Sequence, residues 1–349
     1  MTTYQGAKGA NILVVSSDPS NPLEGQIWYN TTSNTLKAYQ YVAASWSTGP
    51  TLGTARNNMG AGSNNGTQTA YLISGGSPGA APPGPVYSPI TNAGEQYNGS
   101  SWTSAGTMPV SRRSNSGAGT QTAGMSIAGA DTTNSASTDN LLYNGSAWTT
   151  GGSIPANRRD GGACGTQTAT LYIGGFFAPP SVGPPYSNNN NTYVYNGTSW
   201  TSGNTYPTDI YFSGASGTSA AALSSGGTAN PFGPLMTSTA NVNSWNGTSW
   251  TSTTALPTAQ SRVLGSGTQT AQIGFGNASP SANFLYQWNG SSWTTGTGYS
   301  TVRGSAAGGG TSTIASLVTG GDPFSGPRVT DATELYSGAA NTIKTITAS

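Results

Sequence analysis

Arginine is the residue type in this sequence that most clearly offers chemistry. Two doublets, Arg112-Arg113 and Arg158-Arg159, each follow a proline by three residues and place two guanidinium groups next to each other in the chain. Guanidinium groups bind carboxylates and phosphates through paired hydrogen bonds. The four arginines are therefore candidate contacts for an anion. Because an arginine recurs in most repeats of the chain, a structural contact to loop carbonyls or to a neighbouring aromatic ring is the alternative.

The sequence offers few other groups for catalysis. It contains no histidine, a single cysteine at position 164 and ten acidic residues, which are scattered singly. General acid–base catalysis and metal binding usually need such groups in clusters. We therefore expect a non-enzymatic protein with no metal and no cofactor, and we expect Cys164 to be a small buried residue.

The composition excludes some partners. Only 6% of the residues are charged, the net charge is +1, and Gly, Ser, Thr and Asn are abundant. A chain without a basic stripe cannot neutralise many phosphates, so we expect no nucleic-acid partner. No apolar stretch is long enough to span a bilayer, and the first residues show no secretory signal pattern. We expect synthesis without such a signal.

Repeated hairpins must position these residues. The pattern Tyr/Trp-Asn-Gly-Ser/Thr-Ser/Ala-Trp occurs five times, and a degenerate copy, Tyr41-Val-Ala-Ala-Ser-Trp46, lacks the Asn-Gly. Asn-Gly predicts a type I′ turn, because both central residues of that turn need a positive φ. We expect six tryptophans to pack inside sheets: Trp46, Trp102, Trp148, Trp200, Trp250 and Trp293. Trp245 and Trp288, which replace the usual Tyr, are candidates for exposed ligand or subunit contacts.

Two further elements recur between the hairpins. One is Gly-Thr-Gln-Thr-Ala, as at residues 66–70 and 165–169, and the other is a short apolar strand that ends in two glycines, as at Gly75-Gly76. Together with the hairpin they predict four short strands per repeat, which is the content of one propeller blade. The repeat length also matches the roughly 40 to 50 residues of propeller repeats and exceeds that of a β-helix.

The combined pattern of double glycine, Tyr, turn, Trp and Pro-x-x-Arg resembles the kelch repeat over residues 36–349. The double glycine departs from the pattern at Gly129-Ala130 and at Gly274-Phe-Gly276, and the last copy, Tyr336-Ser-Gly-Ala-Ala-Asn341, lacks its Trp. The resemblance implies an all-β propeller of four-stranded blades. The first and last copies are each half complete, so we expect one blade shared by both ends: six blades closed by an N-terminal strand, or alternatively seven.

The segment before the repeats forms another hairpin pattern. Strands are expected at residues 26–29 and 35–41 on either side of a polar turn. The sequence Glu-Gly-Gln-Ile-Trp-Tyr-Asn-Thr-Thr-Ser-Asn-Thr-Leu-Lys resembles a hairpin of bacteriophage tail fibres and other virion appendages. The resemblance implies a virion protein; an ordinary hairpin that starts the propeller is the alternative. We therefore expect an arm at 1–18, an anchoring hairpin at 19–47 and a propeller at 48–349.

Long Pro-, Gly- and Asn-rich loops at residues 77–93, 176–192 and 228–240 are expected to leave one face of the ring, where variable loops often carry recognition. Their aromatic residues are candidate contacts for glycans or for neighbouring subunits: Tyr87, Phe176, Phe177, Tyr186 and Phe232. The hairpin turns are also N-glycosylation sequons, at Asn98, Asn144, Asn196, Asn246 and Asn289, although turn chemistry alone explains their Asn-Gly.

Three functions remain open at this stage. The favoured hypothesis is a phage virion appendage, a tail fibre or decoration subunit that is held by residues 1–47 and that contacts host glycans or neighbouring subunits through its propeller loops. The second is a non-viral surface filament that polymerises by strand addition. The third is a secreted carbohydrate-binding propeller. The first two predict a homo-oligomer or an assembly with other virion proteins, on a virion or an extracellular surface.

Overall fold

A computed structural model describes residues 12–59, 66–79, 89–177, 187–188, 190–229, 237–276, 283–324 and 329–347. Over these residues the chain consists of strands and turns without any helix, so the all-β prediction is confirmed. None of the described segments is a helix with the length and apolar character to cross a membrane. The chain divides into two compact units, residues 46–337 and a smaller unit of residues 1–45 with 338–349.

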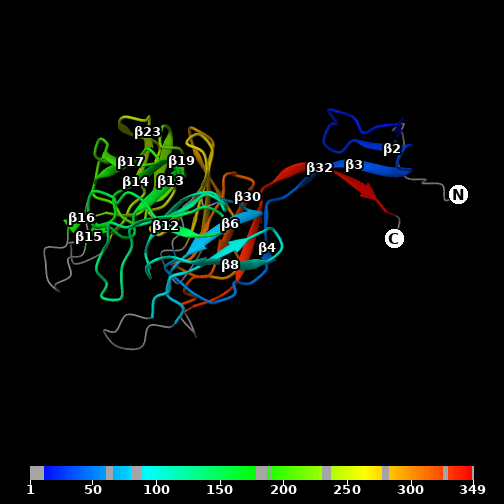
Figure 1. Cartoon of the computed structure of the whole chain (residues 1–349). Coiled ribbons are helices and arrows are strands. Elements are labelled where there is room, and N and C mark those ends of the chain that lie inside the picture. Colours follow the sequence, from blue (N-terminus) through cyan, green and yellow to red (C-terminus); the bar gives the residue numbers. More distant parts are fainter. Residues whose placement is uncertain are drawn as a thin grey trace. The chain divides into compact units, whose positions relative to one another are not determined.

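The larger unit contains four-stranded antiparallel sheets, one per repeat, compatible with the blades of a propeller (Figure 1). The first sheet is β5 (Gly66–Thr67), β6 (Ala70–Ser74), β7 (Ala93–Tyr97) and β8 (Trp102–Thr107), and the second is β9 (Ser116–Gly119), β10 (Gly124–Ile127), β11 (Asn140–Tyr143) and β12 (Trp148–Thr150). The third is β13 (Gly162–Thr166), β14 (Ala169–Ile173), β17 (Thr192–Tyr195) and β18 (Trp200–Ser202).

The remaining sheets of this unit continue the same order. The fourth is β19 (Gly214–Gly217), β20 (Ala222–Ser225), β23 (Val242–Trp245) and β24 (Trp250–Ser252), and the fifth is β25 (Val263–Gly267), β26 (Gln272–Gly276), β27 (Phe284–Trp288) and β28 (Trp293–Gly296). Two short ribbons extend the third and fourth repeats: β15 (Phe176–Phe177) with β16 (Ser187–Asn188), and β21 (Thr228–Ala229) with β22 (Thr237–Ser238).

The sixth sheet combines strands from both ends of the larger unit. It contains β29 (Ala307–Gly309), β30 (Ala315–Thr319), β31 (Thr333–Ser337) and, beside β31, β4 (Ser45–Gly49). Trp46 on β4 lies with its ring centroid 5.1 Å from that of Tyr336 on β31. The N-terminal copy, which has Trp46 but lacks the Asn-Gly, and the C-terminal copy, which has Tyr336 but lacks the Trp, therefore meet in one sheet.

The five complete Asn-Gly hairpins are confirmed, but their predicted turn type is wrong. The aromatic residue pairs directly with the Trp, as in Tyr97 with Trp102, so four residues form the loop. Gly99 has a positive φ, whereas Asn98 does not. Instead, the side-chain Oδ1 of Asn98 accepts hydrogen bonds from the N–H groups of Ser100 (3.0 Å) and Ser101 (2.9 Å). Asparagine therefore acts here as a side-chain acceptor that orders the loop.

Apolar clusters lie between neighbouring sheets. Leu72, Ala105 and Met108 of the first repeat pack with Leu141 and other residues of the second, and Tyr71 and Trp102 pack with Leu317 of the sixth. Glutamines of the Gly-Thr-Gln-Thr-Ala elements add polar links. Each donates from Nε2 to the main-chain oxygen of the aromatic residue at or near the end of the third strand of another sheet: Gln68 to Tyr336 (2.6 Å), Gln121 to Tyr97 (2.5 Å), Gln167 to Tyr143 (2.8 Å) and Gln269 to Trp245 (2.5 Å).

The smaller unit is a sheet of four strands in the order β1 (Leu13–Val15), β2 (Ile27–Asn30), β3 (Thr35–Val42) and β32 (Ala340–Ile346). The hairpin of β2 and β3 confirms the strands expected at residues 26–29 and 35–41. β1 runs parallel to β2. β32 pairs with β3 over its whole length, so the division differs from the sequence-based one, which placed residues 340–346 in the propeller.

A carboxylate organises the smaller unit. Asp18 accepts hydrogen bonds from Trp28 Nε1 (3.0 Å) and Asn30 Nδ2 (2.7 Å), and its Oδ2 lies 2.7 Å from Lys37 Nζ. Trp28 is fully buried. The hydrogen bonds from Lys37, Trp28 and Asn30 lower the pKa of Asp18 to about 2. Asp18 therefore ties the segment after β1 to the β2–β3 hairpin.

Candidate functional site

One residue in each repeat of the larger unit adopts a left-handed backbone conformation at the same place, which in four of the repeats is two positions after the recurrent Arg. The six residues, with φ between 49° and 57°, are Asn58, Ser114, Asp160, Phe212, Arg262 and Ser305. Residues other than glycine rarely adopt this conformation. Its recurrence in all six repeats indicates a shared structural requirement.

Hydrogen bonds between successive repeats explain that requirement. The N–H of Ser114 donates to Asn58 O, that of Asp160 to Ser114 O and that of Phe212 to Asp160 O, each at 2.8 Å. Val263 N–H donates to Phe212 O (3.2 Å), and Arg262 donates from Nη1 to Ser305 Oγ. Asn58 N–H donates to Ser305 O (2.9 Å), so the first repeat is joined to the last. We call these six residues the linking residues.

A polar cavity lies among the linking residues. It has a volume of about 90 Å³, and all six line it together with neighbours such as Asn115 and Ser213. Asn115 Oδ1 and Ser213 Oγ are buried and have no hydrogen-bond partner among the described atoms. Water occupies about 30 Å³ per molecule in the liquid, so the cavity has room for a few waters or a small polar group.

The double glycine positions the Arg site of the next repeat. Gly76 N–H donates to Arg112 O (2.8 Å), and a Cβ added to Gly75, whose φ is +66°, would lie 2.2 Å from that oxygen. In the second repeat Ala128 (φ 60°) and Gly129 (φ 106°) adopt this geometry. The departure at Gly129-Ala130 is thus one of register: the equivalent pair is Ala128-Gly129.

The arginines of the doublets all have partners within the chain. Arg112 forms a salt bridge with Asp139, and Arg158, which is 3% exposed, donates from Nη1 to Asn157 O (2.7 Å). Arg113 Nη2 (2.7 Å) and Arg159 Nη1 both donate to Oδ1 of Asn134. The structure therefore brings Arg113 and Arg159 together and directs Arg112 and Arg158 to other acceptors.

The equivalent arginines of the first and last repeats are structural. Arg56 donates from Nη1 to Gly75 O (3.2 Å) and Ala93 O (3.0 Å), as the carbonyl-contact hypothesis predicts, and pairs with Glu95. Arg303 is fully buried, with its Nη2 3.3 Å from Glu334 Oε1. Burial lowers the pKa of both guanidinium groups, and the neighbouring glutamate opposes this effect.

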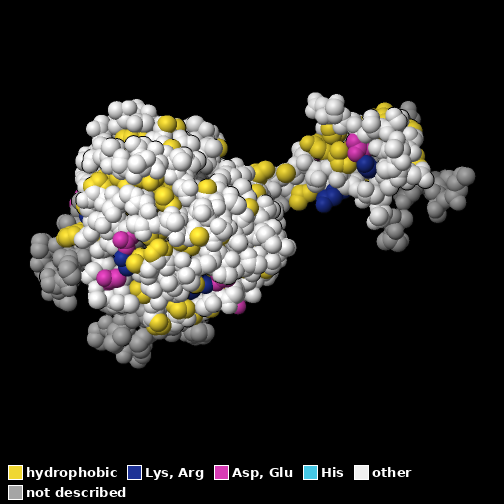
Figure 2. Space-filling view, viewed as in Figure 1, with side chains coloured by type: hydrophobic (Ala, Val, Ile, Leu, Met, Phe, Trp, Pro, Cys, Tyr) yellow, Lys and Arg dark blue, Asp and Glu magenta, His cyan; other side chains and the backbone are white. Residues whose placement is uncertain are grey.

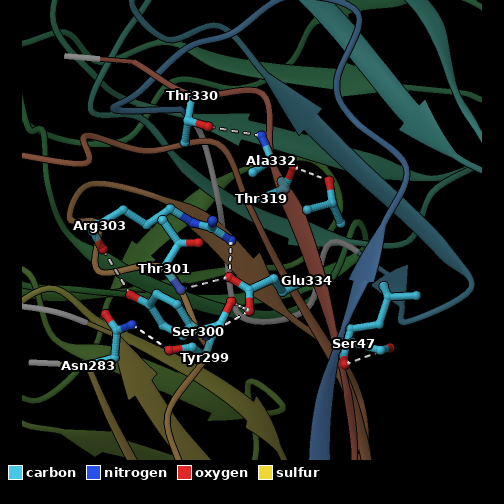
Figure 3. A network of polar contacts seen from close by, with 12 residues as sticks. Ser47, Asn283, Tyr299, Ser300, Thr301, Arg303, Thr319, Thr330, Ala332 and Glu334 are labelled. Atoms are coloured by element: carbon cyan, nitrogen blue, oxygen red, sulfur yellow. Dashed lines mark hydrogen bonds and ion pairs between the residues drawn. The ribbon is translucent and has the colours of Figure 1, made fainter. Parts of the chain in front are cut away.

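Figure 3 shows how Glu334 is held beside Arg303. Ser300 donates to Glu334 Oε2 from its N–H and from its hydroxyl, each at 2.7 Å, and Thr301 N–H donates to Oε1 (3.3 Å). Tyr299 donates its hydroxyl hydrogen to Arg303 O (2.9 Å). These hydrogen bonds satisfy the buried side chain of Glu334 and fix the loop before β29 against β31.

Three aromatic rings lie in succession between two guanidinium groups in the region of the linking residues. The Arg159 guanidinium lies 4.8 Å from the centroid of the half-buried Phe176 ring. Phe176 lies 5.9 Å from Tyr211, and Tyr211 lies 4.7 Å from Phe212. Arg262 lies 4.2 Å from the Phe212 ring. Phe176 and Phe212 are half-buried and Tyr211 is buried, so the partly open rings lie beside positive charge.

The predicted tryptophans divide into two groups. Trp102, Trp148 and Trp200 are buried, whereas Trp46, Trp250 and Trp293 are half-buried. Five of the six indole N–H groups donate toward the preceding repeat: Trp102 to Thr333 Oγ1, Trp148 to Ala105 O, Trp250 to Thr192 Oγ1, Trp293 to Thr254 O and Trp46 to Thr297 O. Their position between neighbouring repeats is what a packing role requires.

The exposure expected of Trp245 and Trp288 is wrong. Trp245 is 1% exposed and Trp288 is 5% exposed. Their indole N–H groups donate to Ser219 O (2.9 Å) and Gln269 O (3.1 Å), on the turn between the first two strands of their own sheets. Each ring packs at a tilt against the Trp across the hairpin, with 5.2 Å between the ring centroids, so neither is an accessible ligand contact.

The remaining predicted residues fall into three classes. Phe176 and Phe177 are half-buried on β15, and Tyr87, Tyr186 and Phe232 lie outside the described residues. The side chains of the sequon residues Asn98, Asn144, Asn196, Asn246 and Asn289 are exposed, and their glycosylation stays a prediction. Cys164 is fully buried as predicted, and burial raises its pKa to about 12.

Sequence reasoning missed the linking residues and Asn134. The only signal for the former was their constant place after the Arg site, because their residue types differ between repeats. Asn134 lies in the loop between β10 and β11, at the place where the other repeats have loops of different sequence. No three His, Cys, Asp or Glu side chains gather into a metal-binding group anywhere in the described part of the chain. In comparisons with known proteins, no family model matches the chain and no curated protein matches it.

Proposed function

We propose that this protein is a non-enzymatic structural subunit of an extracellular assembly, in the favoured case a phage virion appendage such as a tail fibre or decoration. The smaller unit would hold the subunit in the assembly. The larger unit would present its loop face to host glycans or to neighbouring subunits. One observation carries the proposal: exposed apolar side chains are concentrated on the smaller unit.

That concentration is pronounced. Of the exposed large apolar residues among those described, all but Ile314 lie in the smaller unit. The strand register places Val14, Ile27, Val42 and Ile346 on one face of its sheet, since residues alternate between faces along a strand. Each of these four side chains is at least 38% exposed. We call this surface the apolar face.

Other copies of the same chain are the partners that we propose for the apolar face. The described residues of the smaller unit carry two acidic residues, Asp18 and Glu24, and two basic ones, Lys37 and Lys344, so copies would not repel one another. Contiguous exposed apolar surface on a soluble protein usually marks an interaction site. Figure 2 shows hydrophobic side chains gathered on the visible side of this unit.

We further propose that the sheets of the larger unit form a closed six-bladed, kelch-like propeller. Support comes from β4 completing the sixth sheet, from the hydrogen bond of Asn58 to Ser305, and from the bonds of Gln68 and Trp102 to the sixth sheet. The sheet that pairs β3 with β32 belongs to the other compact unit, so we do not count it as a seventh blade.

Two experiments test this proposal. The first is electron microscopy of the native source material with this chain located by antibody. Copies on a tail or capsid would support the virion assignment, and free fibrils without capsids would overturn it in favour of a surface filament.

The second experiment is light scattering of the purified chain. We expect oligomers for the natural chain and for Ile314→Lys, but monomers for the double variant Ile27→Lys, Ile346→Lys.

A monomeric natural chain would contradict self-association through the apolar face.

Closure of the propeller has its own test. Gln68→Ala removes bonds between the first and sixth sheets, and Gln121→Ala removes a bond between the first and second. In a closed ring each substitution should cost about 1 kcal/mol of unfolding free energy. In an open array Gln68→Ala would cost nothing.

A further inference from the structure

Two positive charges share one neutral acceptor on the larger unit. Arg113 Nη2 lies 2.7 Å from Asn134 Oδ1, and Arg159 Nη1 donates to the same oxygen. Arg113 and Arg159 occupy equivalent positions in neighbouring repeats, next to the linking residues Ser114 and Asp160. A hydrogen bond to an anionic oxygen is roughly twice as strong as one to a neutral oxygen. The arrangement is therefore better suited to a carboxylate or sulfate oxygen than to the amide it holds.

The acceptor is held in place by a tight loop. Asp131 Oδ1 accepts hydrogen bonds from Thr133 N–H (2.8 Å), Ser135 N–H (3.0 Å) and the Thr133 hydroxyl (2.7 Å). Asn134 N–H donates to Asp131 O (3.0 Å), and Asn134 has a φ of +66°. Asn134 is thus presented to the two arginines by a preformed turn, and an incoming anionic oxygen must displace its side-chain oxygen from the two guanidinium groups.

Two nearby carboxylates have ion-pair partners of their own. Asp139 pairs with Arg112, and Asp160 pairs with Arg159, with 3.7 Å between Asp160 Oδ2 and Arg159 Nε. The amide oxygen shared by Arg113 and Arg159 thus carries no formal charge of its own. All three side chains are half-buried, so an incoming group would meet partly desolvated donors, which strengthens the interaction.

A flat apolar surface adjoins the charges. The Phe176 ring lies 4.8 Å from the Arg159 guanidinium and contacts Tyr211 at 5.9 Å between centroids. Phe176 is half-buried, with part of its surface open. Sugar rings present C–H faces that pack on aromatic rings, and an anionic substituent on the same sugar would reach the arginines.

We propose that Arg113, Asn134 and Arg159 form a binding site for the anionic group of an acidic sugar, a carboxylate or a sulfate, with Phe176 as the platform for the sugar ring. The anionic oxygen takes the place of Asn134 Oδ1 between the two guanidinium groups. This inference rests on the proposed function, because it names the class of glycan that the loop face would contact.

Binding to the full chain tests the inference. The probes are a uronic-acid oligosaccharide, a sulfated galactose oligosaccharide and a neutral galactose oligosaccharide of equal length, measured by calorimetry at low and high salt. We expect at least one anionic probe to bind about tenfold or more tightly than the neutral one, and the difference to shrink at high salt. Which anionic probe binds identifies the group as a carboxylate or a sulfate.

Variants of Asn134 and Arg159 test whether these residues form the anion site. Asn134→Asp builds a carboxylate into the site, so it should raise the melting temperature and abolish the preference for anionic probes. Arg159→Gln should weaken anionic binding about tenfold or more. Asn289→Asp adds the same charge to an exposed turn of another hairpin and should change neither property. Equal binding of neutral and anionic probes, or unchanged anionic binding by Asn134→Asp, would overturn the inference.

The outcome for the site is separable from the outcome for the assembly. If the natural chain assembles on particles but binds no anionic sugar, the inference fails and the structural role stands. If the chain binds anionic sugars and is found on no particle and in no filament, the inference stands and the assembly role fails. A lower melting temperature for Asn134→Asp would contradict the charge argument without any ligand.

Discussion

The two compact units place their large side chains in opposite ways. In the larger unit, the described tryptophans and most of the described tyrosines are buried or half-buried, and Ser, Thr and Asn are frequent among the exposed residues. In the smaller unit Trp28 is buried on one side of the sheet, whereas Val14 and Ile27 are exposed on the other. A sheet with one uncovered apolar face is incomplete by itself. The larger unit buries its apolar surface internally, whereas the smaller one leaves apolar side chains exposed, which is the basis of the proposed self-association.

The units also differ in how they use charge. Arg56 with Glu95 and Arg303 with Glu334 are buried ion pairs in the larger unit. The pair of Asp18 with Lys37 in the smaller unit is partly open to solvent. Buried pairs are costly to break because the remaining charge has no solvent, whereas open pairs are not. The contrast leads to four predictions, from the largest expected effect to the smallest.

Glu95→Gln should lower the unfolding free energy of the larger unit by about 3 to 5 kcal/mol, because it leaves the Arg56 guanidinium buried without its counter-charge. Chemical denaturation followed by tryptophan fluorescence measures the loss. Asp139→Asn is the matched control, since that side chain is 31% exposed and its pair should be worth about 1 kcal/mol or less. Equal losses for the two variants would contradict the role assigned to burial.

Trp28→Ala should destabilise the smaller unit by about 3 to 5 kcal/mol, because it empties a fully buried site. Hydrogen exchange read by mass spectrometry should show faster exchange in β2, β3 and β32. Exchange in the strands of the larger unit should remain at its natural rate. If β9 and β13 lose protection as well, the two units unfold together and the comparison between them breaks.

Two glycines with a positive φ allow the free-energy cost of backbone strain to be measured separately from the cost of close atomic contact. Gly75→Ala in the larger unit should cost about 2 to 4 kcal/mol, because the new Cβ would meet Arg112 O as well as adopt a strained conformation. Gly25→Ala in the smaller unit, where no atom lies within 4 Å, should cost about 1 kcal/mol. Thermal unfolding of both variants is the measurement. A cost for Gly25→Ala equal to that for Gly75→Ala would remove the close-approach explanation.

The smallest expected effect is a pH dependence of the smaller unit. The folded-state pKa of Asp18, about 2, lies below its usual value of 3.8, so the ionised form is favoured by folding. Its stabilising contribution is therefore fully present above about pH 4 and is lost as the pH falls toward 2. Hydrogen exchange of β2 and β3 at pH 5, 3.5 and 2.5 should show this loss. Asp18→Asn should be less protected at pH 5 and should change less on acidification; an unchanged profile would contradict the role of Asp18.

Much of the fold follows from local patterns in the sequence. The alternation that ends in Tyr97 and resumes at Trp102 predicts two strands and the turn between them, and the structure pairs these residues directly. The turn type was mispredicted because the Asn98 side chain, by accepting two N–H groups, favours a four-residue loop over the two-residue one. Trp245 was mispredicted because a Trp fits the Tyr position once its N–H reaches Ser219 O.

The candidate site was predicted less completely. The doublets predicted Arg113 and Arg159 as candidate anion contacts, but they predicted Arg112 and Arg158 equally. Only the folded chain separates them, because Asp139 lies within reach of Arg112 and Asn134 lies within reach of the other two. No local pattern predicts that residues from two repeats converge on one side chain of an intervening loop.

The sequence by itself determined the repeating strand content, the aromatic hairpins and the shared sheet of the two half-copies, since each depends on residues a few positions apart or on an incomplete copy that needs its other half. Tertiary structure alone decided that β32 pairs with β3, that Trp245 is buried and that Arg113 and Arg159 share Asn134. The physical reason is that these contacts join residues far apart in the chain or depend on the shape of a packed site. Local propensity does not encode such contacts; the geometry of the assembled sheets does.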